Sequence, residues 1–169
     1  PPTVTADINT LMKKVSKSIL GKVDKKGAYF RWSVHFTQSE ITRIINHKCN
    51  TSFENVISLK PLKRGVSGRI IKLEISGIEN DKSQNVQLNS EYEIRDALHP
   101  EFLYSSAFII ILDLDDDQII KSMTLKGAGW GHGVGLCQIG ALGMALSNKT
   151  STDILFHYFP STKIKKMYG

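Results

Sequence analysis

The sequence predicts a single α+β domain, in which antiparallel β-hairpins pack against helices and a glycine-rich loop leads into two C-terminal helices. Segments rich in β-branched and aromatic residues are joined by short turns, and helical segments with recognisable caps lie between them. This mixture is typical of α+β proteins and differs from the repeating strand–helix–strand unit of a parallel sheet. The 169 residues suffice for one domain with a sizeable core, and no internal repeat or linker divides them.

The first part of the chain is expected to contain a helix, a strand and a second helix. Residues 6–20 carry apolar side chains at helical spacing, with lysines on the opposite face. The aromatic and β-branched run at 28–36 indicates a strand. Thr37 and Glu40 are spaced as a capping box, which predicts a helix that continues to about Asn46.

The middle of the chain is expected to be mainly β-structure. Residues 53–78 predict two strands around a glycine-containing turn, and residues 89–98 predict a short helix. The segment 107–114 is apolar enough to be a strand covered on both faces, and a turn leads from it into a strand at 119–125. In the second strand of the first hairpin, one buried face is predicted for Ile71, Leu73 and Ile75.

The C-terminal part is expected to be helical. Residues 135–146 predict a helix with many small residues, in which Gly140 and Gly143 give a flat face for tight packing. Residues 151–159 predict a second helix, which Pro160 ends.

Charge and cysteine content restrict the class of partner only loosely. The formal net charge is +6, from 22 Lys and Arg against 16 Asp and Glu. This favours a polyanionic partner such as nucleic acid, acidic lipid or an anionic cell-wall polymer, but it selects none of the three. Nucleic acid is not expected, because no surface that combines basic and aromatic residues is apparent. Cys49 and Cys137 are either two free thiols or one disulfide, and a metal ion at these cysteines stays open.

The sequence has no segment expected to cross a membrane. No apolar run reaches the roughly 18 residues that a transmembrane helix needs, and no signal-peptide pattern is present. The chain starts at Pro1 without a methionine, so we expect a processed form or a fragment.

Common cofactor-binding motifs do not fit. The glycine-rich stretch at 127–135 lacks both the Gly-Lys-Ser/Thr of a phosphate-binding loop and the G-x-G-x-x-G spacing of dinucleotide-binding proteins. The acidic run at 113–117 begins like a calcium loop, but Gln118 and Thr124 replace the glycine and glutamate that such a loop requires. These motifs therefore predict no cofactor and no metal ion, and the two cysteines are the one place where a metal ion stays open as an alternative.

The glycine segment, which we define as residues 127–135 (GAGWGHGVG), has glycine at every second position. In an extended conformation, Trp130 and His132 would project to the same side, opposite a surface of bare main chain. Tryptophan rings and free backbone groups could then receive sugar rings and their hydroxyls. The alternative is a tight crossing of chain segments in which His132 is a buried hydrogen-bonding residue.

Two stretches resemble the SpoIID/LytB family, named after a sporulation protein and an amidase enhancer. They are GAGWGHGVGLCQIGALGMA at 127–145 and TDILFHYFPSTKI at 152–164, where Phe159 and Ser161 replace the family's Tyr and Gly. Weaker similarity extends upstream through EIRDAL and LYSSAF, SGRIIKLEISG and YFRWSVHFTQSEI. The resemblance divides the chain into an N-terminal amphipathic helix and connector, 1–28, and a C-terminal body, 29–169, of a SpoIID-like domain.

The resemblance implies an extracytoplasmic protein of the bacterial envelope that acts on peptidoglycan, either released there or anchored by a segment outside this chain. Some members of the family are lytic transglycosylases, which cut the glycan strand with internal cyclisation, and others are amidase enhancers. In the enzymes, one acidic residue would protonate the departing glycosidic oxygen and then help the sugar's own hydroxyl to attack.

The glutamate-bearing helix that supplies this acid in the family has no counterpart here, so no catalytic residue is assigned. One explanation is that the chain is the C-terminal part of a longer enzyme, completed by a segment before Pro1 or by a second chain. The other is a divergent module that binds the wall, or enhances an amidase, without cutting glycan.

The residues expected to bind substrate lie at the glycine segment and just after it. His157 and Tyr158 are expected to hold that segment in place, and Arg95 either faces an anionic substrate group or pairs with Asp96 or Glu93. The expected substrate-binding residues are Gly129, Trp130, Gly131, His132, Gly133 and Gln138.

Overall fold

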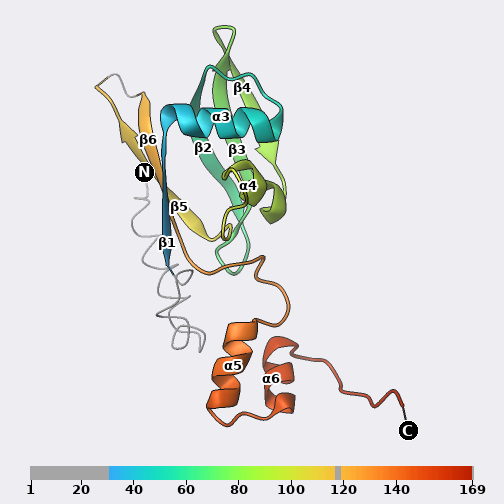
Figure 1. Ribbon diagram of the computed structural model, residues 1–169. Coiled ribbons are helices and arrows are strands. Elements are labelled where there is room, and N and C mark those ends of the chain that lie inside the picture. Colours follow the sequence, from blue (N-terminus) through green and yellow to red (C-terminus); the bar gives the residue numbers. More distant parts are fainter. Residues whose placement is uncertain (1–30, 117–118, 169) are drawn as a thin grey trace.

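A computed structural model describes residues 31–116 and 119–168 and confirms the α+β class. These residues form two three-stranded antiparallel sheets and four helices (Figure 1). The helix expected at 6–20 lies outside the described residues, as does the start of the strand expected at 28–36.

The first sheet has the strand order β1-β6-β5 and ends at the glycine segment. At one end of the sheet Trp32 is paired with Gly127, and at the other end Thr37 is paired with Ser122. The strands are β1 (Trp32–Thr37), β5 (Phe108–Leu114) and β6 (Ile120–Gly127).

The second sheet has the order β2-β3-β4 and contains the expected hairpin. A third strand, β4, was not expected, because its residues are polar and mostly exposed at the edge of the sheet. The strands are β2 (Asn55–Arg64), β3 (Ile70–Glu79) and β4 (Lys82–Leu88).

Helix α3 (Gln38–Cys49) connects the two sheets, contacting β1 and β6 of one and β2 of the other (Figure 1). The expected capping box is confirmed, since Thr37 accepts a hydrogen bond from Glu40 N while the Glu40 carboxylate accepts one from Thr37 N. The helix runs three residues past Asn46, because Asn50 ends it in the left-handed conformation with φ 53°. Helix α4 (Glu91–Ala97) confirms the short helix expected at 89–98 and packs against β3 and α3.

The core lies between the sheets and these two helices, and it corrects two expectations. Leu73 and Ile75 are buried as expected, but Ile71 is half-buried and Ile70 takes its place, because the β2–β3 register shifts near this point. Strand β5 is not covered on both faces. It is an edge strand, and its apolar residues after Ile110 are exposed, namely Ile111, Leu112 and Leu114.

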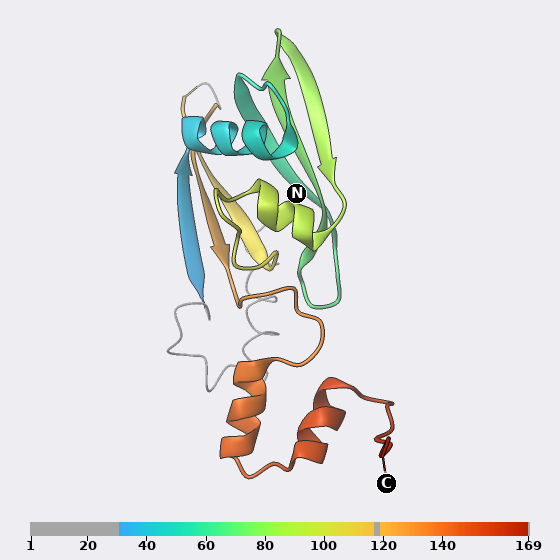
Figure 2. The ribbon, with the colours of Figure 1, turned by 45° about the vertical axis from the view of Figure 1, so that its right-hand side comes forward.

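Helices α5 (Gln138–Leu146) and α6 (Ser151–Tyr158) confirm the two C-terminal helices. They pack against each other and lie apart from the sheets, beyond the end at which β6 enters the glycine segment (Figure 2). A second capping box, formed by Thr150 and Asp153, starts α6. The glycine segment is thus the connection between the β-structure and the helical pair.

Candidate functional site

The glycine segment is a loop and not an extended strand. The later glycines of this segment, at 129, 131, 133 and 135, all have positive φ, with 98° at Gly131 and 77° at Gly133. Residues other than glycine rarely adopt this conformation. An extended segment with one bare face is therefore the wrong description. The chain instead turns at every second residue, so the glycines permit a compact loop.

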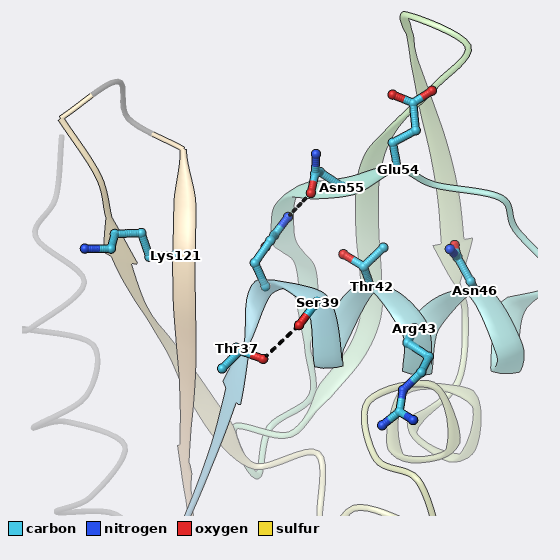
Figure 3. A pocket seen from close by; sticks show the side chains of 9 residues that line it. Thr37, Ser39, Thr42, Arg43, Asn46, Glu54, Asn55 and Lys121 are labelled. Atoms are coloured by element: carbon cyan, nitrogen blue, oxygen red, sulfur yellow. Dashed lines mark hydrogen bonds between the residues drawn. The ribbon is translucent and has the colours of Figure 1, made fainter.

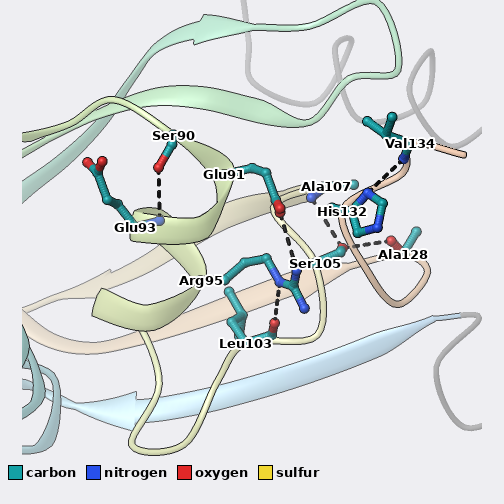
Figure 4. Close-up of polar contacts among 10 residues, drawn as sticks. All are labelled: Ser90, Glu91, Glu93, Arg95, Leu103, Ser105, Ala107, Ala128, His132 and Val134. Atoms are coloured by element: carbon teal, nitrogen blue, oxygen red, sulfur yellow. Dashed lines mark hydrogen bonds and ion pairs between the residues drawn. The ribbon is translucent and has the colours of Figure 1, made fainter.

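Hydrogen bonds fix the first half of this loop to the residues before β5. Ala128 N donates to Ala107 O at 3.0 Å, and Gly131 N donates to Tyr104 O at 2.8 Å. The buried Ser105 hydroxyl donates to Ala128 O at 2.9 Å (Figure 4). These bonds extend the sheet pairing of β6 beyond its last residue, so the loop starts from a fixed position.

Trp32 occupies the space beside Gly127. A Cβ atom at position 127 would lie 2.1 Å from the Trp32 ring, so only glycine fits opposite this indole. The indole Nε1 donates to Gly129 O at 3.0 Å, and the ring packs edge-on against Tyr104. Gly127 is therefore a glycine because two chain segments pack tightly here. Such a tight crossing was the alternative expectation from the sequence for the whole glycine segment.

A second side chain, Arg69, occupies the space beside Gly133. A Cβ atom there would lie 2.3 Å from Arg69 Cζ, whereas no atom of the described residues lies within 4 Å of a Cβ placed on Gly131 or Gly135. The segment thus has one closed side, filled by Trp32 and Arg69, and open positions at Gly131 and Gly135.

Trp130 and His132 are on the exposed side of the loop. Trp130 has 69% of its surface exposed, and His132 is exposed as well, so a buried role for this histidine is wrong. His132 Nδ1 accepts a hydrogen bond from Val134 N at 3.0 Å (Figure 4). In the neutral ring this leaves the proton on Nε2, which becomes the donor available to a ligand.

The other predicted site residues belong to the helical pair. Gln138 is the first residue of α5 and is exposed. His157 is exposed at the end of α6, and its ring packs edge-on against Tyr158 with the ring centres 4.9 Å apart. Burial raises the pKa of the Tyr158 hydroxyl, and the nearby Cys137 side chain adds to the effect. Cys137 is the N-cap residue of α5, and Tyr158 is the last residue of α6. No described hydrogen bond joins His157 or Tyr158 to the glycine segment.

Arg95 makes neither of the expected interactions. It is buried, its Nε donates to Leu103 O at 2.8 Å, and its guanidinium lies over the Phe102 ring. Its ion-pair partner is Glu91, one helical turn earlier, at 3.4 Å. Asp96 pairs with Lys48 instead. Arg95 thus joins α4 to the segment that carries the glycine loop (Figure 4).

Cys49 and Cys137 are free thiols, so the disulfide alternative is excluded. Burial raises the pKa of the Cys49 thiol, with smaller effects from Asp96 and Glu93. Within 31–116 and 119–168, no three His, Cys, Asp or Glu side chains are grouped so that they could hold a metal ion. None of the helices in these ranges has the length and hydrophobicity that a membrane crossing requires.

A polar pocket of about 610 Å³ lies elsewhere, at the N-terminal end of α3 (Figure 3). Its lining includes Arg43, Glu54 and Lys121. Thr37 and Lys121 belong to the end of the first sheet opposite Gly127, so the pocket and the glycine segment are separate. None of the predicted site residues lines it.

Sequence comparison gives two matches. Residues 3–135 match the model of a family described as a domain of unknown function, DUF8618. The chain is also 34% identical, over 85 residues, to an uncharacterized protein of Brachyspira hyodysenteriae. That alignment covers 50% of this chain and 21% of the relative, so the chain matches about a fifth of that protein's length. Because the family model covers most of the chain, including the two sheets and the glycine segment, this protein belongs to the DUF8618 family.

Proposed function

We propose that the glycine segment binds glycan strands of peptidoglycan and that this chain forms part of a SpoIID-like lytic transglycosylase of the bacterial envelope. The observation that carries the proposal is the exposed Trp130 on a loop whose backbone is open at Gly131 and Gly135. An indole offers a flat apolar face and one N–H donor, which suits a sugar ring with its hydroxyl groups. The resemblance of residues 127–145 to the SpoIID/LytB family supports the choice of ligand.

The way in which the loop is held also suits binding. Its first half is attached to the residues before β5 through Ala107 and Tyr104. A loop that is ordered before the ligand arrives loses less entropy on binding. Trp130 and His132 are therefore presented from a fixed support.

Cleavage would require an acid that the described residues do not offer at this loop. Arg69 lies beside the glycine segment, and the carboxylate whose charge acts on Arg69 is that of Glu91. Glu91 is ion-paired with Arg95, so it is not a free acid. We therefore propose that the acid comes from another part of a longer protein or from a second chain. It would protonate the glycosidic oxygen, and the sugar's own hydroxyl would then attack to give an anhydro product.

The ion pair of Glu91 also favours a second candidate function. Among residues 31–116 and 119–168, the loop has no free carboxylate beside it. A chain that binds glycan in this way would act as a non-catalytic wall-binding module, or as an amidase enhancer. The two candidates share the binding site and differ only in whether glycan is cut.

Sedimentation with insoluble peptidoglycan tests the shared claim, and analysis of soluble products separates the candidates. We expect this chain to sediment with the wall and to release no anhydro-sugar product by itself. The full-length gene product should release anhydro-muramic acid ends if it is a transglycosylase and none if it is a binding module. A chain that stays in the supernatant would exclude both candidates.

A further inference from the structure

Arg69 directly precedes β3, and main-chain hydrogen bonds hold both Arg69 and the residue after it. Its carbonyl oxygen accepts a hydrogen bond from Gly65 N at 2.8 Å, which closes the turn between β2 and β3. The next residue, Ile70, is buried and donates its N–H to Ser106 O at 2.9 Å. The Cα atom of Arg69 therefore has a fixed position between the β2–β3 hairpin and residues 104–107, which bind the glycine segment through hydrogen bonds.

The guanidinium lies directly beside the loop. Cβ atoms placed on Gly133 and Gly129 would lie 2.4 Å from Arg69 Nη1 and 3.9 Å from Nη2, respectively. The cation thus reaches both positions that flank Gly131, where the loop is open. Trp130 and His132 are the side chains on this same stretch.

Among the described residues, Arg69 has no ion-pair partner of its own. The carboxylate whose charge acts on Arg69 is that of Glu91, and Glu91 is ion-paired with Arg95. Within 31–116 and 119–168, no hydrogen-bond partner is found for the buried Arg69 Nε. Burial lowers the pKa of Arg69, and Arg95 adds to this effect while Glu91 opposes it. Arg69 as a whole is half-buried. A partly desolvated cation without an ion pair favours a ligand that supplies the anion.

We propose that Arg69 binds a carboxylate of the ligand at the glycine segment, so that acidic glycans are preferred over neutral ones. This inference rests on the proposed glycan binding. The planar guanidinium can donate two parallel hydrogen bonds to one carboxylate. In peptidoglycan the carboxylate belongs either to the lactyl group of muramic acid or to the stem peptide, and the chemistry at Arg69 is the same.

Three probes test the preference and separate its sources. They are a chitooligosaccharide, which has no carboxylate, glycan strands freed of stem peptides, and glycan fragments that retain them. We expect the wild-type chain to bind at least one carboxylate-bearing probe about tenfold more tightly than the chitooligosaccharide. Arg69→Gln should lose this difference and keep its affinity for the neutral probe, and Arg69→Lys should recover part of the difference.

Arg43→Gln is the matched control, because it removes one positive charge from an exposed site on α3. It should leave the preference intact. If it reduces the preference as much as Arg69→Gln does, the effect is one of net charge and the proposal is wrong. Should Arg69→Gln not fold, the NMR signal of Arg69 Nε–H in the wild-type chain gives the answer. It should shift with carboxylate-bearing probes and not with the chitooligosaccharide.

The outcomes distinguish this inference from the proposed function. Equal affinity of the wild-type chain for neutral and acidic probes overturns the role of Arg69 and leaves glycan binding intact. A preference for acidic probes that survives in Arg69→Gln also overturns it. Failure of all three probes to bind refutes glycan binding itself, and the role of Arg69 with it.

Discussion

The guanidinium of Arg69 lies so close to the main chain of Gly133 that a Cβ atom at this glycine would come within 2.3 Å of Arg69 Cζ. At Gly131, by contrast, no atom from the part of the chain that the structure describes lies within 4 Å of such a Cβ atom. Both glycines have positive φ, which favours glycine at each position. Gly133 differs from Gly131 in that the end of the Arg69 side chain lies against it.

Replacing each of these glycines by alanine should give similar losses of stability. Gly131→Ala should cost about 1–2 kcal/mol of unfolding free energy, from backbone strain at positive φ. Gly133→Ala should cost about the same, because the guanidinium is the far end of a flexible side chain and can move away from the methyl group. Urea unfolding of the two variants measures the losses. A much larger loss in Gly133→Ala would show that Arg69 cannot move from this position.

The contact between Trp32 and Gly129 should contribute to the stability of the loop. Trp32→Phe keeps an aromatic ring in the core but leaves Gly129 O without its donor at 3.0 Å. We expect a loss of about 2 kcal/mol in unfolding free energy, together with faster hydrogen exchange at Gly131 N. Unchanged exchange at Gly131 would mean that the indole does not hold the loop.

Stability should fall on acidification in part through Glu40. Hydrogen bonds from Thr37 lower the pKa of the Glu40 carboxyl in the folded chain. The contribution of this group is therefore complete above the ordinary glutamate pKa of about 4.3, and it is lost as the pH falls through the lowered value. The melting temperature of Glu40→Gln should depend less steeply on pH below this range than that of the wild type. Parallel curves for the two proteins would rule out this contribution.

Trp130→Ala should weaken binding to peptidoglycan without destabilising the fold. The side chain is 69% exposed, so its removal takes little from the core. A stacked aromatic ring typically contributes enough for about a tenfold change in affinity. Tyr168→Ala, at another exposed aromatic residue with 84% of its surface accessible, is the control and should bind like the wild type. Sedimentation assays and thermal unfolding measure the two effects, and equal binding by both variants would argue against Trp130.

The sequence predicted the fold class and most elements because local signals and tertiary packing agree. The Thr37–Glu40 capping box and the hairpin turn at Gly68 are local features that folding preserves. Strand β4 and the exposure of β5 were missed, since edge position depends on which strands pair and not on composition.

Only those residues of the candidate site that lie within the glycine segment could be predicted from the sequence. Trp130 and His132 were found because they stand within the glycine segment. Trp32 and Arg69 were missed, although they fill the space beside Gly127 and Gly133. Their contacts cross 95 and 64 positions of the chain, respectively, so no spacing rule reveals them. The similarity of the SGR stretch to the SpoIID/LytB family was the one available signal for Arg69.

An NMR titration of the labelled chain with soluble glycan fragments of peptidoglycan tests the central claim most directly. The two tryptophans give two indole signals, one from buried Trp32 and one from exposed Trp130. We expect the largest shifts at the Trp130 indole and at the backbone amides of 129–135. Shifts centred instead on the pocket around Thr37 and Arg43, or no shifts at all, would contradict the assignment of the glycine segment as the ligand site.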